Sequence, residues 1–303
     1  MSASGSQKAI IAAFCANLGI AVAKFIGFLL TGASSMLSEA IHSVADTGNQ
    51  GLLLLGRHRA DKEADELHQF GYGRERFFWA FVVAVVLFTL GSVFAIYEGI
   101  HKIQHPEELS SPAVAIGILG FAILLEGYSL RTAVVESNKL RGDHSWWGFI
   151  RHSKVPELPV VLLEDFGAIT GLLIALVAVS ASIVTGNGVY DGIGSVAIGL
   201  ILGVIAVVLC IEMKSLLIGE PVSARDRAVY RQAMEGTPGV VRVIHDRTEY
   251  LGAEDVLLAA KVEFAPGLSV AELADAVNAI ERNVRQALPV IGLIYIEPDL
   301  YRF

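Results

Sequence analysis

Cysteine, proline and charge are all scarce in this chain. Of its 303 residues only 2 are cysteine and 9 are proline, and charged residues make up 18%. Cys15 and Cys210 both fall within apolar segments, so the sequence offers neither a disulfide framework nor a zinc cluster of thiolates. The net charge of −8 argues against nucleic acid as a partner.

Apolar residues dominate what remains. They account for 53% of the sequence and mean hydropathy is +0.56, which is too apolar for an ordinary soluble enzyme of this length. Because a helix needs about 20 mostly apolar residues to cross a bilayer, the sequence predicts a multi-pass protein embedded in the lipid bilayer. Six transmembrane helices are expected, over residues 9–31, 35–56, 77–100, 112–136, 159–183 and 189–212.

Lysine and arginine gather in two of the predicted loops. Residues 56–76 contain five of them and residues 137–159 contain four. Cytoplasmic loops are enriched in these residues, so both loops are expected on the cytoplasmic side. An even number of spans then leaves both termini cytoplasmic, and we expect the membrane to be the cell membrane.

From Pro221 the composition becomes mixed and amphipathic, which predicts a transmembrane transport domain over 1–220 and a cytoplasmic domain over 221–303. Ser269 and Glu272 have the spacing of a capping box, and a turn is expected at Leu251-Gly252. The expected elements are a helix over 223–235, strands over 240–250 and 255–264, a helix over 269–288 and a strand over 292–297.

That order of elements predicts a small α+β sheet of ferredoxin-like type. A sheet with an exposed edge or face commonly dimerises. We therefore interpret the tail as a dimerisation or regulatory domain, and the alternative is a solubilising tail.

Ionisable residues inside two of the apolar segments carry the functional signal. An ionised group in hydrocarbon costs at least about 2.5–3.5 kcal/mol, so it indicates a functional site by default. His42 and Asp46 are four residues apart and share one helix face, where both can bind one divalent ion. Zinc takes four nitrogen, oxygen or sulfur ligands, and Asp165 on the fifth span is the expected contributor from a second helix.

Glu164 lies about 100° around the helix from Asp165. Both can ligate one ion only if the helix is locally distorted, which Pro156 and Pro159 would permit. The alternative interpretation is a hydrogen-bonded network that holds the helices together.

Two further acidic residues have weaker claims. Glu39 lies one turn before His42, and either joins the metal site or reaches the membrane surface. Glu126 and Arg131 on the fourth span are interpreted as an internal ion pair.

The order and spacing of several segments resemble the cation diffusion facilitator family of metal exporters. These segments are Asn17, Lys24 and Gly27 in the first span, then residues 34–46, 70–74, 191–195, 243–246 and 296–298. The resemblance implies six transmembrane helices and a cytoplasmic metallochaperone-like domain. It also implies a homodimer that moves a divalent cation out of the cytosol in exchange for protons, with no bound cofactor.

The family also implies a ligand set. Its zinc members carry a His/Asp-x-x-x-Asp pair on both the second and the fifth helix, and here His42 and Asp46 keep the first pair. Val161 stands where the first ligand of the second pair would be, which leaves three ligands with Asp165. Glu164 is the candidate substitute, because the sequence looks like a branch of the family with Glu-Asp at this point; a water molecule is the alternative.

The accessory metal sites of the family look weakened. Tyr72 stands where many members have a second histidine after the one matching His68. Lys261 and Tyr295 occupy the neighbourhood of His245 where other members place histidines. We therefore expect little or no zinc cluster in the tail.

The sequence thus predicts a divalent metal efflux transporter, a Zn²⁺/H⁺ antiporter working by alternating access, with zinc as transported substrate. An enzyme is disfavoured because no His-Glu-x-x-His pair or nucleophile motif is present. The alternatives are a manganese or iron exporter of the same fold and a membrane metal sensor or scaffold that transports nothing.

Overall fold

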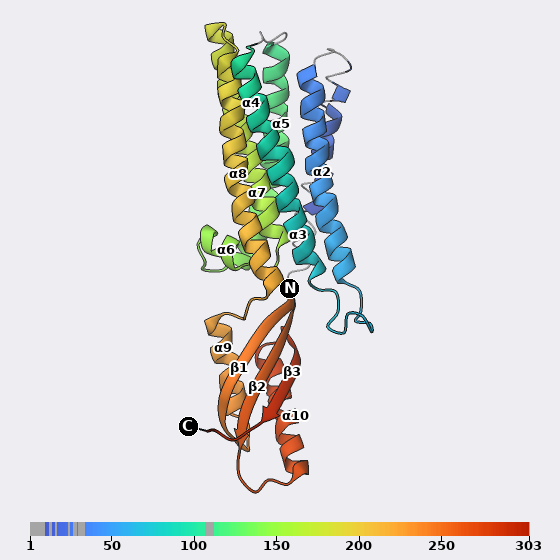
Figure 1. Cartoon of the computed structure of the whole chain (residues 1–303), viewed down its shortest axis with the longest axis vertical. Helices are drawn as coiled ribbons and strands as arrows, with labels where there is room; N and C mark the ends of the chain where they lie inside the picture. The colour runs from blue at the N-terminus through green and yellow to red at the C-terminus, as the bar shows by residue number, and fades with distance from the viewer. Residues whose placement is uncertain are drawn as a thin grey trace. The chain divides into compact units, whose positions relative to one another are not determined.

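The structure is a computed structural model that describes residues 10–11, 14–15, 17–23, 25–26, 29, 34–106 and 112–302. The side chains of residues 34–42, 45, 88, 112, 114 and 115 are outside that description. The chain divides into two compact units (Figure 1). One comprises Met1–Arg59 with Arg76–Lys214, and the other comprises Ala60–Glu75 with Ser215–Phe303.

The first unit is a helical bundle. Its elements are α2 (Ser34–Ala60), α3 (Glu75–Val86), the π-helical segment η1 (Leu87–Val93), α4 (Phe94–Gln104), α5 (Pro112–Arg141), α6 (Trp146–His152), α7 (Glu157–Thr185) and α8 (Val189–Ile218). Within the described residues, four stretches are helical, long and apolar enough to cross a membrane: Glu75–Gln104, Ile116–Arg141, Glu157–Thr185 and Val189–Ile218.

These four stretches match four of the six predicted spans. The span predicted over 9–31 falls largely outside the described residues, although those described between 10 and 29 are helical. Helix α2 covers the span predicted over 35–56 but is not among the four. Its middle is polar, with Asp46, Asn49 and Gln50 within about one turn. The count of six therefore stays a prediction.

Helix α4 packs closely against α8. A Cβ added to Gly99 would lie 2.7 Å from the carbonyl oxygen of Gly192, so only glycine allows the two backbones to approach this closely. Ser92 Oγ donates a hydrogen bond to the Gly199 carbonyl at 2.8 Å, and Lys102 Nζ lies 2.9 Å from Asp191 Oδ2. Two contacts of α4 and one from Ser92 of η1 therefore fix the position of this stretch along α8.

Helix α7 is regular from end to end. It begins after Pro156, and Pro159 stands in its first turn, where the missing N–H has no intrahelical partner to lose. It ends at Gly186, whose φ of +65° is the left-handed conformation of a glycine cap. The local distortion that these prolines would permit is therefore not seen, and residues 164 and 165 keep the divergence of a regular α-helix.

A buried ion pair joins the first turns of α3 and α7. Arg76 donates from Nε to Glu157 Oε1 at 2.5 Å and from Nη2 to Oε2 at 2.8 Å, and the two side chains are 9% and 1% exposed. Two parallel hydrogen bonds satisfy both carboxylate oxygens of Glu157. The pair therefore ties these two helix ends together.

The second unit contains a three-stranded sheet with helices on one face (Figure 1). Its elements are α9 (Ala224–Glu235), β1 (Val240–Gly252), β2 (Asp255–Phe264), α10 (Val270–Ala287) and β3 (Ile291–Pro298). Strand β2 pairs antiparallel with β1 and parallel with β3, so α10 is the crossover between them. Tyr230 and Met234 of α9 pack with Ile280 and Val284 of α10 in the core beneath the strands.

The predicted elements of the tail are confirmed with small shifts. Ser269 and Glu272 form the expected capping box, and Ser223 caps α9. The predicted turn at Leu251-Gly252 is wrong, because β1 continues and Gly252 pairs with Asp255. The turn consists of residues 253 and 254.

The loop between α2 and α3 belongs to this second unit. A Cβ on Gly73 would lie 2.7 Å from the Leu251 carbonyl oxygen, and Arg74 pairs with Glu249. Asp65 orders the loop, because its Oδ2 accepts from the Tyr72 hydroxyl at 2.6 Å while its Oδ1 accepts from backbone N–H groups. These contacts hold the loop against the end of β1.

Asp246 on β1 is the centre of a charged cluster in the second unit. Its carboxylate accepts hydrogen bonds from Arg227 at 2.8 and 3.0 Å and one from the Tyr230 hydroxyl, and Arg231 lies 3.3 Å away. Burial acts to raise the pKa of Asp246, but the hydrogen bonds from Arg227 and Tyr230 outweigh it and hold the pKa below its ordinary value. The ionised form of Asp246 therefore stabilises the folded state.

We expect Asp246→Asn to destabilise the second unit by roughly 2 kcal/mol at neutral pH, because a buried charged hydrogen-bond acceptor is lost. The stabilisation is present above the ordinary pKa of an aspartate, about 3.9, and is lost as the pH falls through the lower pKa of the folded state. Pulse proteolysis of the purified chain across a urea series, at pH 7 and pH 3, measures both effects. A difference between wild type and variant that does not shrink at pH 3 would contradict this assignment.

Candidate metal site

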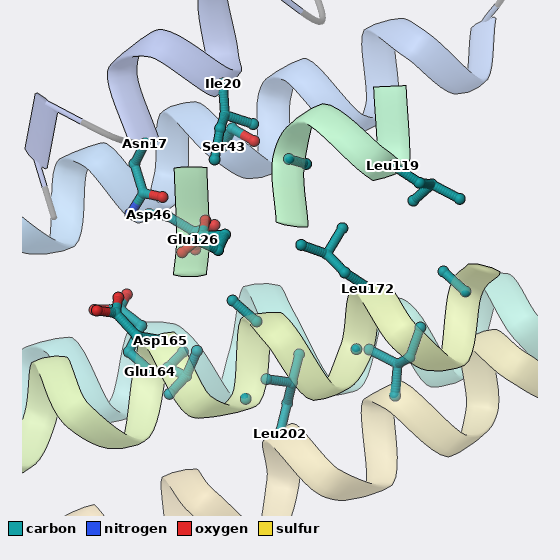
Figure 2. A pocket seen from close by; sticks show the side chains of 17 residues that line it. Asn17, Ile20, Ser43, Asp46, Leu119, Glu126, Glu164, Asp165, Leu172 and Leu202 are labelled. Atoms are coloured by element: carbon teal, nitrogen blue, oxygen red, sulfur yellow. The ribbon is translucent and has the colours of Figure 1, made fainter. Parts of the chain in front are cut away.

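A cavity of about 120 Å³ lies inside the first unit (Figure 2). Four acidic side chains line it: Asp46 of α2, Glu126 of α5, and Glu164 and Asp165 of α7. Figure 2 shows Glu164 and Asp165 entering the cavity from one side, and Asp46 and Glu126 from the other. The remaining lining residues are Asn17, Ile20, Ser43, Leu87, Leu119, Ala122, Gly167, Ala168, Gly171, Leu172, Ala175, Ile198 and Leu202.

Small residues along α7 leave the room for this cavity. Gly167, Ala168, Gly171 and Ala175 follow Glu164 and Asp165 at helical spacing and all line it. Because these side chains are absent or short, the helices leave open volume beyond the carboxylates. The rest of the wall is mostly apolar, so the cavity is an acidic patch in a low-dielectric surrounding.

The acidic residues of the cavity are buried to different degrees. Asp165 is 1% exposed, Glu164 is 4% exposed and Glu126 is 5% exposed, whereas Asp46 is only partly buried. Burying carboxylates without hydrogen bonds or a counter-ion is very unfavourable. The hydrogen-bond donors around each carboxylate therefore show how its burial is tolerated.

Amide groups of α2 hold the carboxylate of Glu164. Asn49 Nδ2 donates to Glu164 Oε1 at 3.0 Å, and Gln50 Nε2 donates to Glu164 Oε2 at 2.6 Å. Asn17 Nδ2 in turn donates to Gln50 Oε1 at 3.2 Å. Asn17, Asn49 and Gln50 are all at most 3% exposed, so this is a buried network that joins three segments of the bundle.

Asp165 faces a different neighbour. Ser129 Oγ of α5 donates to Asp165 Oδ2 at 2.7 Å. Because successive residues of a helix diverge by about 100°, Glu164 meets α2 while Asp165 meets α5. The two adjacent carboxylates thus line one cavity although they bond to separate helices.

The structure brings three of the four predicted site residues together. Asp46, Glu164 and Asp165 line one cavity, whereas the side chain of His42 lies outside the described residues, as does that of Glu39. Among the side chains that are described, no three from His, Cys, Asp and Glu are close enough to hold a metal ion together. Val161 is fully buried and offers no donor atom. The ligand set therefore stays a prediction.

Four polar residues of this region were not predicted to take part in it. Asn49, Gln50 and Ser129 bond to the buried carboxylates, and Glu126 lines the cavity, whereas Arg131 on the same helix is exposed. Asn49-Gln50 follows Asp46 by about one turn in a segment expected to be apolar, and Ser129 follows Glu126 by three residues. An amide or hydroxyl side chain about one helical turn from an acid in an apolar segment is the sequence pattern that would have identified these residues.

The sequence profile of the cation efflux transmembrane domain matches residues 10–218. The chain belongs to the cation efflux family. The resemblance to cation diffusion facilitators is thereby confirmed, and the matched region contains every residue of the cavity. A multi-pass membrane transporter is the class that this family and the four apolar helices establish.

Named relatives cover most of this chain. The proton-coupled zinc antiporter SLC30A9, mitochondrial, of Homo sapiens is 33% identical over 86% of this chain and 46% of its own length. Metal tolerance protein C4 of Arabidopsis thaliana is 30% identical over 86% of this chain and 57% of its own length. The chain therefore spans about half the length of these curated cation efflux relatives.

More distant matches cover less. The cadmium, cobalt and zinc/H(+)-K(+) antiporter of Bacillus velezensis is 31% identical over 39% of this chain and 38% of its own length. A solved structure of the MamM C-terminal domain covers 26% of this chain and 94% of its own length, with 24% identity and a TM-score of 0.24, a value too low to establish a shared fold.

We expect Gln50→Ala to destabilise this cation efflux protein by about 1–3 kcal/mol, since it leaves a buried oxygen of Glu164 without its donor. Thermal unfolding in detergent with a metal chelator present measures the loss. Glu164→Ala combined with Gln50→Ala should cost less than the sum of the single changes, because the orphaned oxygen is removed as well. Ser182→Ala, far along α7, is the control and should add to Gln50→Ala without coupling. Additive costs for Gln50 and Glu164 would contradict the contact.

Proposed function

We propose that the chain is a divalent cation efflux transporter that exchanges zinc for protons by alternating access. The observation that carries this proposal is the cavity, in which acidic side chains of three helices meet among apolar residues. Several carboxylates in so small a volume repel one another unless a cation or protons balance them. A site that binds either a divalent ion or protons is what an exchanger needs.

The proposed ligands are His42 and Asp46 on α2 with Asp165 on α7, and Glu164 would join them only through a local distortion of α7 when the ion binds. Asp46 and Asp165 line the cavity from facing helices, and His42 is one turn from Asp46. Glu164 has both oxygens engaged by amides, yet each carboxylate oxygen has two acceptor sites and keeps one for a metal ion. Helix motion that separates α2 from α7 would then open the site to one side or the other.

Proton exchange follows from the chemistry of these ligands. A metal ion is bound by neutral imidazole and ionised carboxylates, so binding releases protons and protonation releases the metal. The names of two relatives support proton exchange: the human protein is a proton-coupled zinc antiporter, and the Bacillus protein is a cadmium, cobalt and zinc/H(+)-K(+) antiporter.

We also propose how the whole chain is organised in the membrane. Residues 1–220 would form the transport domain and residues 221–303 a cytoplasmic domain through which two copies dimerise. Both termini would be cytoplasmic, since lysine and arginine gather in loops 56–76 and 137–159. The cell membrane is proposed as the location, although one relative is named as mitochondrial.

A manganese or iron exporter is the second candidate, and one observation favours it. The described donors of the cavity are oxygen atoms, and manganese accepts oxygen ligands readily. An imidazole from His42 would favour zinc or cobalt instead. The choice of ion therefore depends on whether His42 contributes its nitrogen.

We expect zinc-driven proton flux in proteoliposomes that contain the purified chain, and its loss in Asp165→Ala, since this removes a ligand oxygen from the cavity. Zinc, cobalt, cadmium, manganese and iron(II) are compared in the same assay. Glu136→Gln is the matched control, because Glu136 is a buried acid of α5 that is not among the residues of the cavity wall. Its flux should match wild type within about twofold, as expected of a site outside the transport path.

Absence of flux with every ion, from folded protein, would favour the sensor or scaffold. Flux that manganese drives at least about tenfold better than zinc, a difference of about 1.4 kcal/mol, would favour the second candidate.

A further inference from the structure

Two histidines at the end of α4 stand apart from the cavity. His101 and His105 are four residues apart, both are exposed, and their ring centres are 5.0 Å apart with planes tilted by 30°. Helix α4 ends at Gln104, but the His105 N–H still donates to the His101 carbonyl at 2.9 Å. The helical turn therefore extends to His105 and places both rings on one face.

This spacing fits a chelate. Two histidines one turn apart on a helix are a recurring zinc-binding arrangement. With Zn–N bonds of about 2.0–2.1 Å and a tetrahedral angle, one zinc ion bound by two imidazoles holds the ring centres roughly 5 Å apart. The observed separation needs little adjustment, beyond rotation of the rings about their side-chain bonds, to bring one nitrogen of each toward a common point.

The helix end that carries the pair is held in place. The close approach of Gly99 to Gly192 and the Lys102–Asp191 ion pair fasten the last turns of α4 to α8. Lys102 is thereby directed to Asp191 at 2.9 Å, so its charge is engaged beside the histidines. A fixed backbone lowers the entropic cost of bringing two side chains to one ion.

Ring stacking is the simpler explanation of the same contact. Tyr97 stacks on His101 at 6.5 Å, so three rings follow one another along α4. Stacking accounts for the ring positions, but it does not explain why the second ring is an imidazole, since any aromatic ring could stack there.

We propose that His101 and His105 form a second metal site, which binds zinc or a similar divalent transition ion through two imidazole nitrogens. Two imidazole nitrogens completed by water suit zinc, cobalt, nickel and copper rather than magnesium or calcium. The site is independent of the cavity, because the two share no residue.

The role of this second site rests on the proposed function. If Arg76 lies on the cytoplasmic side, the stretch Glu75–Gln104 ends on the opposite side of the membrane, which is where an exported cation leaves. The pair then receives the ion after its release from the cavity.

Site-specific footprinting of the full chain tests the binding. The purified protein is treated with diethyl pyrocarbonate across a zinc series, and modification of each histidine is read by mass spectrometry. We expect zinc at micromolar concentrations to protect His101 and His105 together, while magnesium protects neither. In His105→Ala, protection of His101 should need about 100-fold more zinc, because the second donor of an intramolecular pair is lost. His101→Ala should have the reciprocal effect on His105.

The controls separate this site from the transport site. Gln104→Ala changes an exposed neighbour and should leave protection unchanged, and His105→Gln should behave like His105→Ala. In Asp165→Ala, zinc should still protect His101 and His105 even though proton flux is lost. Failure of the proposed transport site can therefore be told apart from failure of the proposed histidine site. The metal site is overturned if zinc at millimolar concentration leaves both histidines reactive, or if His101 is protected equally well in His105→Ala.

Discussion

The cost of burying a carboxylate in a low-dielectric interior is the constraint on which this bundle depends. Each buried acid must find hydrogen-bond donors or a positive charge. Glu157 meets Arg76, Glu164 meets two amides and Asp165 meets a serine hydroxyl. Because all three acids belong to α7, this one helix is tied to α3, α2 and α5 by contacts that are strongly directional. The position of α7 is therefore set by polar chemistry as much as by apolar packing.

Close backbone packing sets the position of α8 against α4 by a different means. Gly99 and Gly192 allow an approach that any Cβ would prevent, and Ser92 bonds to a carbonyl of the facing helix. Packing and hydrogen bonds of this kind stabilise helix pairs in a membrane, where lipid gives no hydrophobic drive between helices. The bundle thus has one pair of helices fixed by small residues and a central helix fixed by ionisable ones.

Sequence patterns predicted the elements of the second unit better than they predicted the contacts of the bundle. Alternating strands and the Ser269–Glu272 capping box are local signals, and both matched the structure within a few residues. The turn after β1 was misplaced because Leu251 and Gly252 continue the pairing with β2. The partners of Glu164 escaped prediction because Asn49 and Gln50 are more than 100 residues away in the chain. Neither residue is ionisable, so a search among acids and histidines passes over them.

The two buried glutamates of α7 show why the type of partner matters. The guanidinium of Arg76 satisfies both oxygens of Glu157 and also brings a full positive charge. Because the two charges cancel, this ion pair attracts a further cation only weakly. The amides of Asn49 and Gln50 satisfy the oxygens of Glu164 without adding charge, so whatever negative charge it carries remains directed at the cavity. Ser129 does the same for Asp165. Glu157 is thus a structural link, whereas Glu164 is the glutamate that we propose responds to an ion, although both are almost fully buried.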